Sequence, residues 1–511
     1  MSDGSDGTRL QASARAESAA LMRGHLSDLL VYEQSATAVT GGVVLAARDG
    51  GTRKLVVCGK VEGFDGASGE VEGTRVVVCD AHERHMAALR EHISWLKPKL
   101  TGTTPSVGLG DRLGLATPGH IAADSNSGFV LVLAQQSIRE MTRTGRTAQQ
   151  VMDDAVFGVF EVGYDKGFGS DADHLKTSAD VDIAARAGFT SFTIDPSEHV
   201  DDTVDAASPA ELAERFGRLV NNGVPGAAKW KSVYVGRSFT VGSLTVTFDE
   251  ASLVKAAVKY GRAINHGVEM AAYINQKVPV SELELSVDET YSPTSVVEHL
   301  FIAREIRERG VTLNSLAPRF VGSFEKGIDY KGDLAEFEAR LRDHVEIARH
   351  YGPYKISLHS GSDKFSVYPI VARVTDGLMH LKTAGTSYLE ALRVAARHDV
   401  PMMREIIRFC RGRFDTDKAT YHVSATLESV PEEGNLKDSD LEHFYLDEDD
   451  GRQILHVTFG SVLTARDNGQ PMFRERLLSL LNREAHTYVE VLKKHIGRHI
   501  RGLKGRGGPA A

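Results

Sequence analysis

The sequence predicts an α/β protein built on a (β/α)8 barrel of the TIM type. Between residues 106 and 430, short apolar segments of strand length alternate with amphipathic segments of helix length. This alternation is typical of a parallel sheet, and eight strand candidates at near-regular spacing favour a closed barrel over an open sheet. No G-x-G-x-x-G follows a strand and no G-x-x-x-x-G-K-[ST] is present. The dinucleotide-binding and P-loop folds therefore lack their sequence signatures.

The strand candidates have apolar centres and end in polar residues. Between most of them lie helical patterns, the clearest being residues 294–310 and 333–352. The eight predicted strands are residues 111–119, 167–176, 188–197, 282–291, 311–320, 354–362, 378–387 and 419–428.

Several segments lie outside the repeating pattern. The third and fourth predicted strands are separated by about residues 197–281, which is long enough for an insertion with helices and a hairpin. Residues 1–20 lack apolar periodicity, so we expect a mobile tail. Residues 21–105 predict a small α/β unit and residues 431–511 a helical C-terminal extension. In the first of these, the expected strands are 41–48, 54–60 and 74–80, followed by a helix near 82–97.

Composition excludes several classes of protein. The formal net charge of −9 and the pI of about 6.1 argue against nucleic acid as a partner. Three cysteines do not make a disulfide framework. The chain has no apolar run near 18 residues and no signal-peptide pattern at its start, so we expect no membrane partner and a cytoplasmic location.

Histidines and charged side chains gather at the ends of the predicted strands. In a barrel of this type, functional groups lie at the C-terminal ends of the strands, so these residues are the candidates for chemistry. An unpaired imidazole beside apolar strand residues would be costly, which favours a role for the histidines. The candidates are Asp171, Asp173, His174, Lys176, Asp195, Ser197, Asp288, Glu289, Arg319, Glu325, Lys326, Asp329, His359, Ser360, Ser362, Asp363, Lys364, His380, Lys382, Thr383 and His422.

Two histidines and a carboxylate are a common ligand set for a divalent first-row metal. His174, His359 and Glu325 could meet over the barrel mouth, and Asp288, Glu289 and His380 are rival ligands. Asp173 and His174 are adjacent in the chain, and adjacent strand residues point to opposite faces. Both reach the mouth only if the strand has already ended there.

Small polar residues follow the sixth and seventh predicted strands, where the backbone turns into a helix. Free N–H groups at a helix start bind anions, and Lys364 and Lys382 stand nearby. A compact anion such as a carboxylate would fit, so we expect Lys176, Arg319, Ser360, Lys364, His380 and Lys382 to bind substrate. The alternative is ordinary N-capping by Thr386 or Ser387.

Five ordered segments together resemble one family. They are GSDADHLKT (169–177), AGFTSFTIDPSEHV (187–200), LAPRFVGSFEKGIDY (316–330), KISLHSGSDKFSVYP (355–369) and HLKTAGTSYLEALR (380–393). They are similar to the tagaturonate/fructuronate epimerases, bacterial hexuronate C4-epimerases, and the similarity runs from about residue 107 to about residue 490.

The resemblance implies an isomerase of carbohydrate metabolism that interconverts D-fructuronate and D-tagaturonate with a divalent metal such as Mn, Fe, Co, Ni or Zn. It further implies His174 and His359 as metal ligands, with a third ligand in the segment that holds Glu325. Asp173 and Glu289 are implied as the acid/base pair.

The C4 hydrogen of a 2-keto hexuronate is β to the ketone, so simple enolisation cannot epimerise this carbon. Retro-aldol cleavage between C3 and C4, rotation of the aldehyde and re-addition would do so, with the metal as Lewis acid and the long insertion closing the site. Three alternatives stay open: a metal-dependent aldolase, a Schiff-base aldolase on Lys176, Lys355 or Lys382, and a sugar-acid sensor without activity. The sequence leaves the oligomeric state open, with a homo-oligomer as one option.

Overall fold

The computed structural model describes residues 26, 28–124, 126–383 and 385–504. The tail predicted over residues 1–20 lies outside this range. Among the described residues, no helix combines the length and the apolar character needed to cross a membrane.

Eight parallel strands close into a barrel, as predicted. Their order around the barrel is β12-β13-β14-β15-β6-β7-β8-β9, with β12 paired to β9. Most of their residues are buried, as expected for strands of a parallel barrel that helices cover. The strands are β6 (Ser106–Gly108), β7 (Val130–Ser137), β8 (Gly169–Leu175), β9 (Ser191–Ile194), β12 (Glu282–Val287), β13 (Ser315–Pro318), β14 (Lys355–Leu358) and β15 (Met379–Lys382).

The first predicted strand, residues 111–119, is wrong. The short strand β6 precedes it, and the buried Asp111 carboxylate then accepts hydrogen bonds from the backbone N–H groups of Leu113, Gly114 and Ala116. These three hydrogen bonds stabilise a turn and not a strand, because the N–H groups that they use cannot pair with a neighbouring strand. The second barrel strand, β7, lies in a segment for which no strand was predicted.

The last predicted strand, residues 419–428, is also wrong. Its N–H groups bind side chains: Ser424 donates to Glu325 and Ala425 donates to Gln453. The place beside β15 is already taken by β6, whose pairing closes the barrel. Eight strands therefore form, but the insertion follows the fourth strand, β9, instead of the third.

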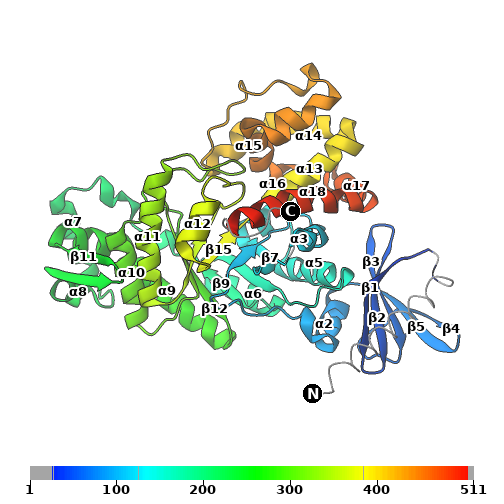
Figure 1. The fold of residues 1–511 in the computed structure, drawn as a ribbon, viewed down its shortest axis with the longest axis horizontal. Helices are drawn as coiled ribbons and strands as arrows, with labels where there is room; N and C mark the ends of the chain where they lie inside the picture. Colours follow the sequence, from blue (N-terminus) through cyan, green and yellow to red (C-terminus); the bar gives the residue numbers. More distant parts are fainter. Residues whose placement is uncertain (1–25, 27, 125, 384, 505–511) are drawn as a thin grey trace.

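Helices cover the outside of the barrel, with the long α9 as the connection that leads into β12. Before it, two helices and a hairpin form the predicted insertion, at the left of Figure 1. The helices around the barrel are α3 (Thr117–Ala123), α4 (Ile138–Thr144), α5 (Ala148–Glu161), α6 (Ser178–Ala187), α9 (Glu250–Lys277), α10 (Val296–Glu308), α11 (Leu334–Tyr351), α12 (Tyr368–Thr375) and α13 (Thr386–His398). The insertion consists of α7 (Pro209–Asn221), α8 (Ala227–Tyr234), β10 (Arg237–Val241) and β11 (Leu244–Phe248).

An antiparallel sheet of five strands precedes the barrel and lies at the right of Figure 1. It contains the three expected strands, as β2, β3 and β5, and two further edge strands. The edge strand β4 is exposed except at Val71, and a register shift between Tyr32 and Thr37 interrupts the alternation of the edge strand β1. The elements are β1 (Leu30–Val39), β2 (Gly42–Asp49), β3 (Thr52–Gly59), β4 (Ala67–Val71), β5 (Thr74–Asp80) and α2 (Glu83–His92).

The C-terminal residues form a helical layer with a hydrophobic core of its own, which includes Leu392, Ile406 and Leu455. The last helix returns to pack against α3, α12 and α13 of the barrel (Figure 1). The elements are α14 (Val400–Asp417), α15 (Asp449–Val457), α16 (Phe459–Thr464), β16 (Arg466–Asp467), β17 (Gln470–Pro471), α17 (Arg474–Arg483) and α18 (Ala485–Leu503).

One buried ion pair joins three parts of the molecule. Arg48 on β2 donates to Glu161 at the end of α5 (2.9 Å) and to Asn482 on α17 (2.7 Å). We expect Arg48→Met to lower the free energy of unfolding by about 3 kcal/mol, because Glu161 would be left buried without its cation. The midpoint of thermal unfolding measures the effect. Arg84→Met, which breaks an exposed pair with Asp65, is the control and should change stability by less than about 1 kcal/mol.

Candidate active site

The C-terminal ends of the barrel strands open into a cavity of about 760 Å³. Its walls come from the strand ends, from the loops that follow them and from the C-terminal layer. Lining residues predicted from the sequence include Asp173, His174, Asp288, Glu289, Arg319, His359, Ser360 and Lys382.

A distortion at the end of β8 brings two adjacent side chains to the mouth. His174 has a φ of 54°, in the left-handed region, and the pairing between β8 and β9 shifts register between Ala172 and Leu175. Strand alternation therefore breaks at this point, so Asp173 and His174 both line the cavity. A non-glycine residue in this conformation is strained, and such strain is concentrated at functional sites.

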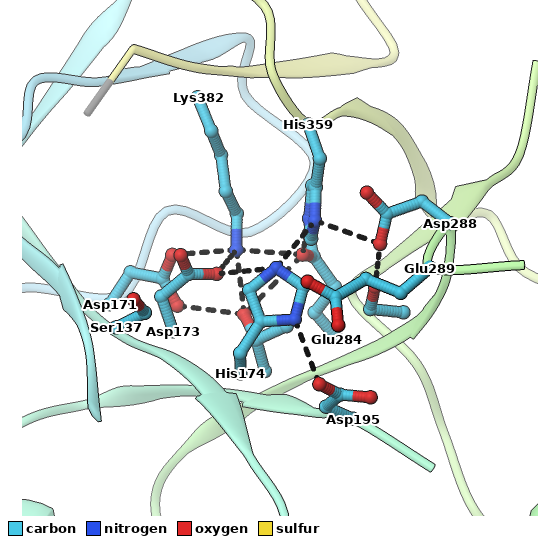
Figure 2. A network of polar contacts seen from close by, with 12 residues as sticks. Ser137, Asp171, Asp173, His174, Asp195, Glu284, Asp288, Glu289, His359 and Lys382 are labelled. Carbon is cyan, nitrogen blue, oxygen red and sulfur yellow. Dashed lines mark hydrogen bonds and ion pairs between the residues drawn. The ribbon is translucent and has the colours of Figure 1, made fainter. Parts of the chain in front are cut away.

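The two histidines face each other at the mouth. The Nε2 atom of His174 lies 3.2 Å from the Nδ1 atom of His359. Their other ring nitrogens contact carboxylates: His174 Nδ1 lies 3.1 Å from Asp195, and His359 Nε2 lies 2.6 Å from Glu284 (Figure 2). The carboxylates thus hold one nitrogen of each ring. The other two nitrogens, His174 Nε2 and His359 Nδ1, point toward a shared position.

Carboxylates surround the two histidines and raise the pKa of each ring. Burial alone would lower the pKa of His174, but Asp173 and Asp195 raise it to about 9. Burial also disfavours the charged form of His359, and Lys382 adds to that, but Asp288 and Glu284 raise its pKa to about 10. The carboxylates therefore stabilise positive charge at the two rings.

Lys382 is the buried cation at the centre of the remaining carboxylates. Its Nζ atom lies 2.8 Å from Asp171, 2.7 Å from Asp173 and 2.8 Å from Glu284 (Figure 2). Burial would lower the pKa of Lys382, but these three carboxylates raise it well above its usual value. Lys382 is consequently a fixed ammonium group and not a free amine.

The predicted acid/base carboxylates lie in different environments. Asp173 is buried, and Lys382 and His174 hold its pKa below the usual range against the effect of burial. Glu289 follows β12, its side chain is 30% exposed, and it accepts a hydrogen bond from Arg139 at 2.8 Å. Both carboxylates have an oxygen near His174.

The structure does not bring Glu325 to the histidine pair. Its carboxylate accepts hydrogen bonds from the backbone and side chain of Ser424 and from Gln453 in the C-terminal layer. Glu325 therefore anchors the segment that was predicted as the eighth strand. Asp173, His174 and His359 form one group of possible ligand atoms around the shared position, and Asp288 lies 3.3 Å from His359 Nδ1.

Three of the expected substrate-binding residues also lie elsewhere. His380 is on the same face of β15 as Lys382 but two residues earlier, so it lies deeper in the barrel, beside Ser106. The Nζ atom of Lys364 is buried and donates to the carbonyl groups of Glu325, Ile328 and Ser362. Lys176 is half-buried and lies 3.4 Å from Glu198.

The alternative of N-capping by Thr386 or Ser387 is wrong. The hydroxyl groups of Thr386 and Ser387 contact His495 and His120, so neither hydroxyl caps its own helix. Sequence reasoning also missed lining residues that come from outside the strand ends. They include Arg112, Arg139, Glu140, Tyr421 and His456. His456 belongs to an amphipathic helix with no local signal of function.

A family model described as tagaturonate epimerase matches residues 32–503. The chain belongs to the tagaturonate epimerase family. The match covers the N-terminal sheet, the barrel and the C-terminal layer, so these parts occur together in the family and the resemblance found in the sequence is confirmed.

Relatives of this family are similar over nearly the full chain. A tagaturonate/fructuronate epimerase from Thermotoga maritima is 43% identical over 434 residues, which is 85% of this chain and 88% of that protein. A crystal structure of fructuronate-tagaturonate epimerase from Cohnella laeviribosi with glycerol is 35% identical, with a TM-score of 0.88, and covers 96% of this chain and 99% of that one. The native structure of the same protein gives a TM-score of 0.89 at the same identity and coverage.

Proposed function

We propose that this protein is an epimerase that interconverts D-fructuronate and D-tagaturonate at C4. Membership of the tagaturonate epimerase family carries the proposal, and the polar cavity at the barrel mouth supports it. The family is one of isomerases, so we assign the chain to the same class of enzyme.

We further propose that His174 and His359 hold a divalent metal ion. Two nitrogens that bind one ion at about 2.1 Å lie about 3.0–3.4 Å apart, and the observed 3.2 Å fits. The carboxylates behind both rings match the way proteins orient metal-binding histidines. The excess of buried carboxylates over cations also suits a divalent ion. When bound, the ion would act as a Lewis acid toward the oxygens of the keto group and its neighbours.

The remaining residues would supply proton transfer. Asp173 or Glu289 accepts the proton of the C4 hydroxyl as the C3–C4 bond breaks, leaving an aldehyde at C4 and an enediolate over C2 and C3. After the aldehyde rotates, the C3–C4 bond forms again on the other face, and the second carboxylate returns a proton to the C4 oxygen. Lys382 keeps Asp173 in the ionised form that a base requires.

The Schiff-base alternative has less support. A Schiff base needs a neutral amine, whereas three carboxylates keep Lys382 protonated. Burial lowers the pKa of Lys355 to about 8, but its Nζ atom donates to Thr101 and Ser106 at the opposite end of the barrel strands. Lys176 is not among the residues that line the cavity.

Proton NMR of D-fructuronate with the purified protein tests the proposal. The protein is stripped with a chelator and reconstituted with Mn, Ni or Zn. We expect tagaturonate only with metal and, in D2O, no deuterium at C4, because retro-aldol chemistry retains the C4 hydrogen. Three-carbon products would indicate an aldolase. Binding without turnover with any of these metals would indicate a sensor.

The carboxylate behind His174 should control metal affinity. We expect Asp195→Asn to weaken metal binding about 10- to 100-fold, because the imidazole loses its negative partner. A competition titration with a metal-sensitive dye measures this change. Asp182→Asn is the control, because Asp182 pairs with Lys277 on the exposed surface and should bind metal as the wild type does. Equal affinities in all three proteins would contradict the assignment.

The cytoplasmic location and a homo-oligomeric assembly stay predictions. Fractionation of cells and light scattering of the purified protein would test them.

A further inference from the structure

One histidine in the active-site cavity has no hydrogen-bond partner within the described part of the chain. His456 on α15 is 2% exposed, and neither its Nδ1 nor its Nε2 atom is bonded to another described group. Burial and the positive charges of Arg112 and Lys326 hold its pKa well below the usual value, so the ring is neutral. A buried polar group without a partner is costly, and this one lines the cavity, where a ligand can reach it.

Two glycines allow His456 to occupy this position. A Cβ atom on Gly385 would lie 2.0 Å from Cε1 of His456, and one on Gly327 would lie 3.2 Å from Nδ1. The first of these distances is impossible for real atoms. The loop before α13 and the segment after β13 are therefore shaped to admit a ring from the C-terminal layer.

Lys326, the residue before Gly327, supplies a positive charge to the same wall of the cavity. Its Nζ atom donates to the Ser360 hydroxyl at 2.7 Å, and no carboxylate among the described residues lies within ion-pair distance of it. Among the other lining cations, Lys382 is surrounded by carboxylates, Arg112 pairs with Glu140 and Arg139 pairs with Glu289. Arg319, like Lys326, has no carboxylate of the described residues within ion-pair distance.

We propose that Lys326 and His456 form the subsite that binds the carboxylate of the sugar acid and selects a keto-hexuronate over a neutral ketohexose. The inference rests on the proposed function and adds to it the recognition of the acidic group. A carboxylate would pair with the Lys326 ammonium group and accept the N–H of the neutral imidazole, which satisfies both side chains.

The charge distribution of the cavity favours this orientation of the substrate. The histidine pair lies among carboxylates, which repel the acidic end of a sugar acid. Around His456 the positive charges are those of Arg112, Lys326 and Arg452 and the negative charge is that of Asp363, while Glu140, Asp288 and Glu289 act on Lys326. The C-terminal layer would then have a direct role in substrate recognition, because α15 places His456 in the barrel mouth.

Binding measurements on the metal-loaded protein test the subsite. Isothermal titration gives the affinity for D-tagaturonate and for D-fructose, a neutral ketohexose, in wild type, Lys326→Met and His456→Leu. We expect each substitution to weaken binding of the acid about 10- to 100-fold and to leave binding of the neutral sugar unchanged within about 3-fold. Lys326→Arg and His456→Gln should restore part of the preference, because they keep a charge or an N–H donor.

A matched control uses the same segment of the chain. Lys331→Met removes a lysine that is 47% exposed and is not among the lining residues, so the preference for the acid should not change. An unchanged preference in Lys326→Met and His456→Leu, with wild-type epimerisation intact, would overturn the subsite and leave the proposed function standing. A preference that depends on Lys326, in a protein that never epimerises the acid, would overturn the function alone. No preference for the acid in wild type would overturn the subsite, whether or not the acid is epimerised.

Discussion

Replacing His359 with alanine should abolish metal binding and lower the rate of epimerisation by at least about 10³-fold. The imidazole is held by Glu284 on one side and faces His174 on the other, so its loss removes one of two proposed nitrogen ligands. Metal ions contribute several kcal/mol of transition-state stabilisation, which corresponds to this loss in rate. Metal content by mass spectrometry and turnover by proton NMR are measured on the same sample.

The matched variants separate a ligand role from a structural one. His174→Ala should have the same effect, and the double variant should be no slower than either single variant, because one metal site is lost in each. His350→Ala, on the exposed surface of α11, should keep both metal and activity. Full metal content in both His174→Ala and His359→Ala would contradict the proposed site.

Glu289→Gln and Asp173→Asn should each lower kcat by about 10²- to 10⁴-fold while the metal stays bound. Amides of the same shape keep the local packing but cannot accept a proton, and that range is typical for loss of a general acid or base. At position 173 the isostere fits well, because the Oε1 atom of Gln135 is buried without a partner among the described residues and can accept from the new amide.

Metal content decides between the two roles open to Asp173. Loss of metal in Asp173→Asn would make this residue a third ligand and leave Glu289 as the only proton carrier. Glu198→Gln, a change in an exposed carboxylate that pairs with Lys176, should leave kcat unchanged. Wild-type turnover in Glu289→Gln would contradict its proposed role.

The sequence by itself determined the barrel and the general place of the chemistry. Short strand candidates such as β14, KISL, with apolar Ile356 and Leu358, alternate with helical patterns, and this alternation is visible without any structure. His174 lies near the end of one strand candidate and His359 directly follows another, so both could be placed at the strand ends, where a parallel barrel collects its functional groups. Ordered motifs along the chain also resembled the family to which the chain belongs.

Only the tertiary structure decided which of the candidates meet. The left-handed conformation of His174 turns two adjacent side chains to one cavity, and strand alternation alone forbids that. The Glu325 carboxylate binds Ser424 and does not reach the histidine pair. His456, on a helix of the C-terminal layer, lines the cavity. The periodicity of apolar residues indicates whether a residue is buried, because burial follows the local repeat of a strand or helix. The partners of a loop side chain are set by contacts between distant segments, which leave no local pattern.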